Sequence, residues 1–269
     1  MIDLHVHLVP GVDDGPKDWD VALALARKAY AGGIRTATIT PHHMPGTYEN
    51  TASQIQNYVR QLQAAYEREG IDIQLLPGQE AYPEGDLRER YERGELQTLA
   101  DGAYLLVDLP QQDCPFYMEQ LLFSLQAKGL MTLLAHPERN RSLRHHPERL
   151  EAMIQSGVRA VMSAGSMHGA YGPSAQKSAH DFLKRGLIQI VASDAHHPDG
   201  PAFFPLQNRP LVESLIGPDR AWEVMERNPQ YVLDSKEIPA PLYDLEAEAG
   251  ATRRKASGGG FWSRLFSRV

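Results

Sequence analysis

Histidine and acidic side chains recur in this sequence at the ends of short apolar segments, in patterns that suit metal binding. The first segment ends in His5-Val6-His7, and alternate residues of a β-strand point to the same side, so both imidazoles face one way. Two neutral imidazoles that converge at a strand end make half of a metal site. An isolated pair is weak evidence, because two histidines near a surface produce the same pattern.

The pair is not isolated, because later apolar segments also end in His, Asp or Glu. The further candidate ligands are Asp14, His42, Glu80, Asp108, His136, Asp194 and His196. Imidazole and carboxylate donors without a thiolate suit manganese, iron or zinc at a catalytic site better than a structural zinc site. About nine donors exceed what one ion needs, so the sequence predicts a cluster of two or three metals.

The elements that must position these side chains alternate along the chain. We expect strands over residues 2–6, 36–40, 73–76, 104–109, 131–135, 160–163 and 188–192. We expect helices near 18–31, 51–69, 84–93, 115–128, 147–156, 173–185 and 208–216. The alternation predicts an α/β fold with a parallel sheet, either closed into a barrel or doubly wound. In a barrel the carboxyl ends of the strands share one face, where active sites lie.

Charge and composition exclude several classes of protein. The chain has 269 residues and a net charge of −7, and its last twenty residues hold five basic residues and no acidic one. Residues 1–249 therefore carry a net charge of −12, and an acidic body of this kind repels nucleic acid. No apolar run reaches the length of a membrane span, and no secretory signal is visible at the N-terminus.

The single cysteine, Cys114, predicts a reducing, cytoplasmic location, since no intrachain disulfide can form. It also argues against a phosphocysteine mechanism, which needs an arginine six positions after the cysteine, where this chain has Gln120. Serine-hydrolase and nucleotide-triphosphatase motifs are absent from the sequence. We therefore expect Cys114 to be an inert, packed thiol.

The last part of the chain differs in composition. We expect a domain over residues 1–235 and a flexible tail over 236–269, with a Gly-rich tether at 257–260. On a helical wheel, residues 261–269 separate apolar side chains from Ser and Arg. Two interpretations of this segment remain open. It forms a helix on contact with an anionic membrane or a partner groove, or it is a disordered tail.

In order, the motifs H-x-H, D-D-G, T-P-H-H, G-Q-E, the acid at position 108, A-H-P-E-R and S-D-A-H resemble the PHP (polymerase and histidinol phosphatase) superfamily. Within it, the chain is similar to the bacterial manganese-dependent protein tyrosine phosphatases of capsular and exopolysaccharide synthesis. The resemblance spans about residues 1–235. It implies a distorted (β/α)7 TIM-like barrel with the metal site at the carboxyl ends of the strands.

The resemblance also implies roles for individual residues. His5, His7, Glu80 and Asp194 would hold a first metal, and Glu80 would bridge to a second metal shared with Asp108 and His136. A third metal would be held by Asp14, His42 and His196. Asp108 stands where this group usually has Glu; the shorter carboxylate can still ligate, but the second metal would sit differently or bind more weakly. Arg139 matches the substrate-phosphate arginine, and Arg209 is the only candidate for a second one, although it lies further downstream than the pattern suggests.

The activity implied is that of a phosphoric monoester hydrolase acting on phosphotyrosine, with Mn²⁺ as cofactor and Fe or Zn as alternatives. The substrate would be a bacterial tyrosine kinase tail that regulates polysaccharide export, and the location would be cytoplasmic or peripheral at the inner face of the membrane. The alternatives are a small-molecule phosphatase acting on a substrate such as histidinol phosphate, a nuclease, which the acidic body disfavours, and a metal-stabilised binding module without turnover.

Overall fold

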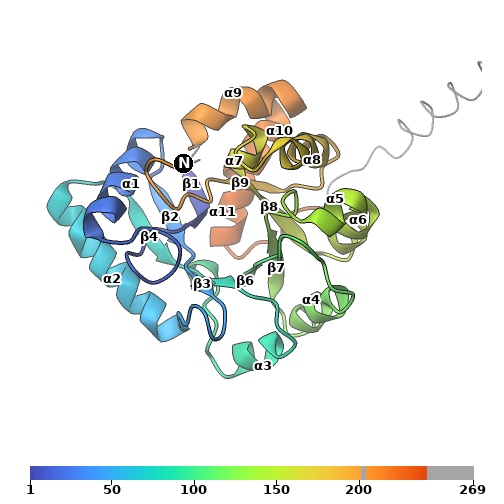
Figure 1. The fold of residues 1–269 in the computed structure, drawn as a ribbon, viewed down its shortest axis with the longest axis horizontal. Helices are drawn as coiled ribbons and strands as arrows, with labels where there is room; N and C mark the ends of the chain where they lie inside the picture. Colours follow the sequence, from blue (N-terminus) through green and yellow to red (C-terminus); the bar gives the residue numbers. More distant parts are fainter. Residues whose placement is uncertain (201–203, 241–269) are drawn as a thin grey trace, which may run out of the picture.

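The computed structural model describes residues 1–200 and 204–240, in which a ring of parallel strands is surrounded by helices (Figure 1). The strands are β1 (Ile2–Val6), β2 (Thr36–Ile39), β3 (His42–His43), β4 (Gln74–Pro77), β5 (Glu80–Ala81), β6 (Tyr104–Val107), β7 (Met131–Ala135), β8 (Arg159–Ser163) and β9 (Ile190–Ala192). They form two parallel sheets, in the orders β1-β2-β4 and β3-β5-β6-β7-β8-β9.

Two of the expected strands, over 36–40 and 73–76, are each followed by a second strand of two residues that belongs to the other sheet. β2 and β3 are separated by Thr40-Pro41, and β4 and β5 by Gly78-Gln79. Proline lacks an amide hydrogen, so it cannot donate to a ladder at this position. A side chain at Gly78 would meet Cγ2 of Thr38 at 2.5 Å, so glycine is needed for the close approach. As a result, His42 and Glu80 lie opposite each other in the second sheet, on β3 and β5.

The last strand returns to the first. Val6 and Ala195 form a parallel bridge, in which the amide of His7 donates to the carbonyl of Ala195 at 3.0 Å. The amide of Asp194 donates to the carbonyl of His5 at 2.9 Å. The strand order thus runs round from β1 to β9 and back, which confirms the expected α/β architecture with a parallel, distorted barrel-like sheet.

Helices follow the strands and cover the outside of the ring (Figure 1). They are α1 (Trp19–Ala31), α2 (Ala52–Glu69), α3 (Leu87–Glu92), α4 (Met118–Gln126), α5 (Arg141–His145), α6 (Pro147–Gln155), α7 (Ala164–Met167), α8 (Pro173–Lys184), α9 (Pro205–Ile216), α10 (Pro218–Trp222) and α11 (Asn228–Leu233). A 3₁₀ turn, η1 (Leu99–Asp101), precedes β6, and a π-helical turn, η2 (Glu223–Arg227), joins α10 to α11. Among the described helices, none is long and apolar enough to cross a bilayer.

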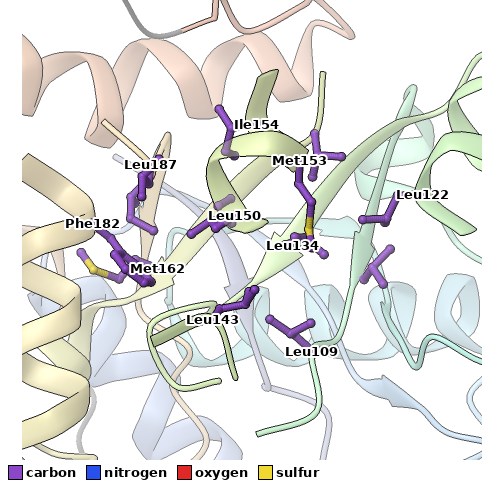
Figure 2. Packing of buried hydrophobic residues seen from close by; sticks show 14 of the residues in the cluster. Leu109, Leu122, Leu134, Leu143, Leu150, Met153, Ile154, Met162, Phe182 and Leu187 are labelled. Atoms are coloured by element: carbon purple, nitrogen blue, oxygen red, sulfur yellow. The ribbon is translucent and has the colours of Figure 1, made fainter. Parts of the chain in front are cut away.

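The largest buried cluster lies between strands β6 to β8 and the helices that cover them. Figure 2 shows Leu134 and Met162 from the strands packed against Leu150 and Ile154 of α6 and Phe182 of α8. All five side chains are almost completely buried. Burying a side chain of this size stabilises the fold by roughly 1.5–3 kcal/mol, so this layer fixes the strands whose ends carry the site.

The amino-terminal end of the barrel is closed by the segment that follows α11. The hydroxyl of Tyr104 donates to the carbonyl of Lys236 at 2.7 Å and accepts from the amide of Ile238 at 3.1 Å. Arg159, buried in β8, donates twice to the carbonyl of Ile238, at 2.9 and 2.8 Å. The expected tail of 236–269 is therefore attached to the barrel as far as Ile238. Its basic amphipathic end, 261–269, lies outside the described residues.

Candidate metal centre

Nine side chains from the carboxyl ends of the strands and the loops that follow them gather round one cavity. They are the nine that the sequence predicts as metal ligands: His5, His7, Asp14, His42, Glu80, Asp108, His136, Asp194 and His196. Three overlapping groups among them have ligand atoms within 4.8 Å of one another. The groups are His7, Asp14, His42 and His196; His5, His7 and Glu80; and His42, Glu80 and Asp108.

Glu80 lies at the centre of this arrangement. Its Oε2 is 3.2 Å from Nε2 of His5, 3.3 Å from Nε2 of His7 and 3.1 Å from Nδ1 of His42. Its Oε1 is 2.9 Å from Nε2 of His136. The Oε2 atom is buried and has no hydrogen-bond partner. Two ligands bonded to one ion at about 2.1 Å lie about 3.0–3.4 Å apart, so these spacings suit donors that share a metal.

The remaining candidate ligands extend the cluster on either side of Glu80. Asp14 Oδ1 is 3.4 Å from Nε2 of both His42 and His196. On the other side, Oδ1 of Asp108 is 3.6 Å from Nε2 of His136. Donors are therefore spread over more space than one ion occupies, which suits a cluster of ions.

Neighbouring groups orient the imidazoles. Oδ2 of Asp13 is 2.8 Å from Nδ1 of His7 and accepts from the amide of His42 at 3.1 Å. The carboxylate of Asp13 can only accept, so Nδ1 of His7 donates to it, and Nε2 is the nitrogen that would bind a cation in the cavity. Below the site, buried Asp3 accepts from the amides of His5 and Ser193, at 3.4 and 3.1 Å, and so ties β1 to the end of β9.

Two of the candidate ligands have strained backbones. His136 has φ of 37° and Asp194 has φ of 50°, in the left-handed region that non-glycine residues rarely adopt. Each amide remains bonded to a neighbouring strand, His136 to Val161 at 2.7 Å and Asp194 to His5 at 2.9 Å. Such strain costs about 1–3 kcal/mol per residue and gathers at functional sites.

The charges in the cluster are unevenly distributed. Burial alone would raise the pKa of Glu80, but the imidazoles of His5 and His42 hold the pKa of this carboxyl well below its usual range. Burial and the negative charge of Glu80 raise the pKa of Asp108 to about 8. Although burial opposes it, His196 lowers the pKa of Asp14 to about 2. Crowded carboxylates of this kind are typical of a site that is neutralised by cations.

A pocket of about 360 Å³ opens above the cluster. Its wall is formed by Met44, Tyr48, Tyr82, Leu109, Pro110, Gln111 and Arg139. Nη1 of Arg139 donates to Oδ2 of Asp194 at 2.7 Å, and its guanidinium lies 4.1 Å from the ring centre of Tyr171. The pocket thus combines a floor of candidate metal ligands with one arginine and a wall that includes Tyr48 and Tyr82.

The structure does not bring Arg209, the other predicted phosphate-binding residue, to this pocket. Its guanidinium pairs with Glu226 and Glu213 and lies 4.0 Å from the sulfur of Met1. Met1 precedes β1, whereas the metal-binding candidates follow the carboxyl ends of the strands. Arg209 is on α9, whose ion pairs direct the side chain toward η2.

Several wall residues are not identified by the sequence analysis. Tyr82 follows Glu80 by two positions, so the period of two in a strand could have indicated it. Tyr48 stacks on His42, with ring centres 5.9 Å apart, and Tyr171 covers Arg139 from the turn between α7 and α8, and neither has a local motif. Cys114 is buried outside the pocket, and burial raises the pKa of its thiol to about 11, as expected for an inert cysteine.

Residues 1–234 match the model of the family described as capsular polysaccharide synthesis, CpsB/CapC, and the chain belongs to this family. It is 33% identical over 238 residues to the tyrosine-protein phosphatase YwqE of Bacillus subtilis, covering 88% of this chain and 93% of the relative. It is 28% identical to the tyrosine-protein phosphatase CpsB of Streptococcus pneumoniae, covering 87% and 98%. The predicted resemblance is therefore confirmed.

Solved structures agree. The chain superposes on a crystal structure from a study of YwqE and CpsB, described as unique metal-dependent tyrosine phosphatases, with a TM-score of 0.85 and 32% identity. The superposition covers 90% of this chain and 99% of the other. Dihydroorotase from Campylobacter jejuni shares the fold alone, with a TM-score of 0.51 and 12% identity over 88% of this chain and 84% of the enzyme.

Proposed function

We propose that this member of the CpsB/CapC family is a metal-dependent phosphatase that hydrolyses phosphotyrosine in a protein substrate. The observation that carries the proposal is the convergence of nine imidazole and carboxylate donors beneath a pocket that also holds Arg139. The tyrosine phosphatase names of the relatives support the choice of substrate.

We propose that the cluster holds manganese, with iron or zinc as alternatives, because its donors are nitrogen and oxygen only. His5, His7, Glu80 and Asp194 would hold one ion. Glu80 would be shared with a second ion, held by Asp108 and His136, and Asp14, His42 and His196 would hold a third. The unpartnered Oε2 of Glu80 supports a bound cation. When bound, the ions supply a water of lowered pKa and positive charge for the phosphoryl group.

The chain's own residues bind and orient the ester. Arg139 would donate to the phosphoryl oxygens through its planar fork, held in place by Asp194 on one side and by the ring of Tyr171 on the other. Tyr48 and Tyr82 would contact the substrate ring. A tyrosine phenolate leaves readily, since the free phenol has a pKa of about 10, so no strong general acid is needed.

The protein substrate that we propose is a bacterial tyrosine kinase tail in polysaccharide synthesis, and the proposed location is cytoplasmic, with peripheral membrane contact through 261–269 as the alternative. The family description supports the polysaccharide context. The single, buried Cys114 agrees with a reducing compartment.

The test is metal content by elemental analysis together with turnover of a phosphotyrosine peptide before and after His136→Ala. We expect the substitution to lower turnover at least about 100-fold and to reduce bound metal, because it removes a ligand beside Glu80. The matched control is His145→Ala, which removes an exposed histidine on α5. Equal turnover by the two variants would refute the proposal.

The rival reading, a small-molecule phosphatase, is separated by the substrate. With manganese present, the chain is expected to prefer an aryl phosphate to histidinol phosphate, because the wall of the pocket is aromatic. The reverse preference would favour the small-molecule reading, and no turnover of any phosphate ester under several metals would favour a binding module.

A further inference from the structure

Two exposed aromatic side chains lie beside the pocket, on the segment that forms part of its wall. Leu109, Pro110 and Gln111 line the pocket, and the chain then continues to Phe116 and Tyr117, the two residues immediately before α4. Phe116 is 92% exposed and Tyr117 is 47% exposed. Ordered, exposed aromatic residues next to a binding pocket are typical of interaction surfaces.

The fold holds this segment in place. The side chain of Asn140 donates to the carbonyls of Pro110 and Asp113, at 2.5 and 2.8 Å. Arg149 donates to the carbonyls of Cys114 and Pro115, at 2.7 and 3.3 Å. The exposure of Phe116 is therefore set by bonds from α5 and α6 to the backbone before it.

A guanidinium supports the ring itself. The central carbon of the Arg149 guanidinium is 5.4 Å from the ring centre of Phe116, within the range of a cation–π contact. Arg149 is in turn fixed by Glu119, at 2.7 Å. A ring held in this way loses little conformational entropy when a partner covers it, which favours binding.

Tyr117 connects the exposed ring with the wall of the pocket. Its hydroxyl donates to the carbonyl of Pro83 at 3.2 Å, next to Tyr82, which lines the pocket. The pKa of Tyr82 is raised by burial, then by Asp108, and next by Tyr117, as expected for two neighbouring phenols. Tyr117 thus lies between Phe116, its neighbour in the chain, and the segment Tyr82-Pro83 at the wall of the pocket.

We propose that Phe116 and Tyr117 form a docking surface for the polypeptide that flanks the phosphotyrosine of the substrate, and that this surface selects an apolar side chain near it. The inference rests on the proposed function. A pocket of about 360 Å³ admits one side chain, so the residues on either side of a bound phosphotyrosine must lie on its rim. An extended peptide advances about 3.3 Å per residue, so a side chain a few positions away reaches this surface.

The test compares substrates that differ only outside the pocket. The probes are free phosphotyrosine, a phosphotyrosine peptide with leucines flanking the phosphotyrosine, and the same peptide with serines in their place. For Phe116→Ala we expect KM for the leucine peptide to rise about 10-fold with kcat unchanged, as for loss of one aromatic contact at an interface. Turnover of free phosphotyrosine should stay within about twofold of the unaltered chain.

The matched control is Phe123→Ala, which removes a 69% exposed phenylalanine on α4, the helix that follows Phe116. Phe123 lies seven residues after Phe116 in the chain, inside α4. This variant should treat all three substrates like the unaltered chain. The serine peptide should be insensitive to Phe116→Ala, because the apolar partner is missing.

The outcomes separate this proposal from the proposed function. Loss of turnover on all three substrates in Phe116→Ala, or equal KM for the leucine and serine peptides in the unaltered chain, would overturn the docking surface and leave phosphotyrosine hydrolysis standing. Failure of the unaltered chain to hydrolyse any of the three would overturn both.

Discussion

Glu138 is fully buried and lies in the chain between the candidate ligand His136 and the phosphate-binding candidate Arg139. Its Oε1 accepts from the amide of Ser163 at 3.1 Å and from Oγ of Ser166 at 2.7 Å, and its Oε2 has no partner. Burial is the main cause that raises the pKa of Glu138 from its ordinary 4.5 to about 7. Glu138→Gln keeps the accepting oxygen and removes the titration, so it isolates the effect of ionisation.

The sign of the effect follows from the direction of the pKa change. Because the pKa in the folded chain is above that of the unfolded chain, the stability that Glu138 contributes is present below pH 4.5 and is lost as the pH rises through 7. The difference corresponds to about 3 kcal/mol once Glu138 is ionised. Glutamine does not ionise. As the pH rises from 5 to 8, the free energy of unfolding of Glu138→Gln should therefore increase by about 2–3 kcal/mol relative to that of the unaltered chain.

The assay is denaturation by heat and by urea, in chelator, at pH 5 and pH 8. At each pH, the difference in Tm between Glu138→Gln and the unaltered chain is measured. For a domain of this size, that difference should be about 5–10 °C larger at pH 8 than at pH 5. Glu67→Gln, at an exposed glutamate on α2, serves as the matched control and should show no pH-dependent difference. A constant offset for Glu138→Gln at both pH values would refute the reasoning, because it would mean that the carboxyl does not titrate on this interval.

Three further outcomes are expected. Arg139→Ala should lower kcat/KM about 100- to 1,000-fold, and Arg139→Lys should recover little of this activity, because an ammonium lacks the planar fork. The measurement is steady-state kinetics on a phosphotyrosine peptide. Full activity of the lysine variant would contradict the prediction. Iodoacetamide near pH 7.5 should leave activity intact, and Cys114→Ala should stay within about twofold, because burial keeps the thiol pKa at about 11; inactivation in proportion to alkylation of Cys114 would contradict this. Removing metal with a chelator should abolish turnover and lower Tm, and added manganese should restore both. Complete removal is verified by elemental analysis. Turnover that survives it would contradict a metal-dependent mechanism.

The convergence of the candidate metal ligands could be predicted from the sequence, because their geometry follows from a simple rule. Side chains at the ends of parallel strands meet on one face, so His5, Glu80, His136 and Asp194 converge although they are far apart in the chain. The apolar strand segments were sufficient to indicate the order of the elements. Their ends were less accurate, since the strand expected over 104–109 ends at Val107.

Other features depend on packing that no local pattern encodes. Arg209 follows the Asp194 motif in the sequence, but α9 turns its side chain toward Glu226, so proximity in sequence gave no proximity in space. The short helices α10 and α11 were not anticipated, because their few turns are stabilised by burial against the barrel rather than by a long amphipathic repeat. Tyr171 approaches Arg139 from another loop, and only the folded chain reveals that contact.

The parts of the site also differ in what holds them in place. The candidate metal ligands are fixed by strands and by bonds across the barrel, and two of them, His136 and Asp194, are held in left-handed conformations that an isolated loop would abandon. Charge adds to this strain, because burial and Glu80 together keep Asp108 from ionising at neutral pH unless a cation is close. A metal held at Asp108 would therefore displace a proton, and occupancy of that position would depend on pH. The wall is built on the same strand ends, since Tyr48 stacks on His42 and Tyr82 directly follows β5, so a substitution at either tyrosine is expected to affect the candidate ligands as well as the substrate.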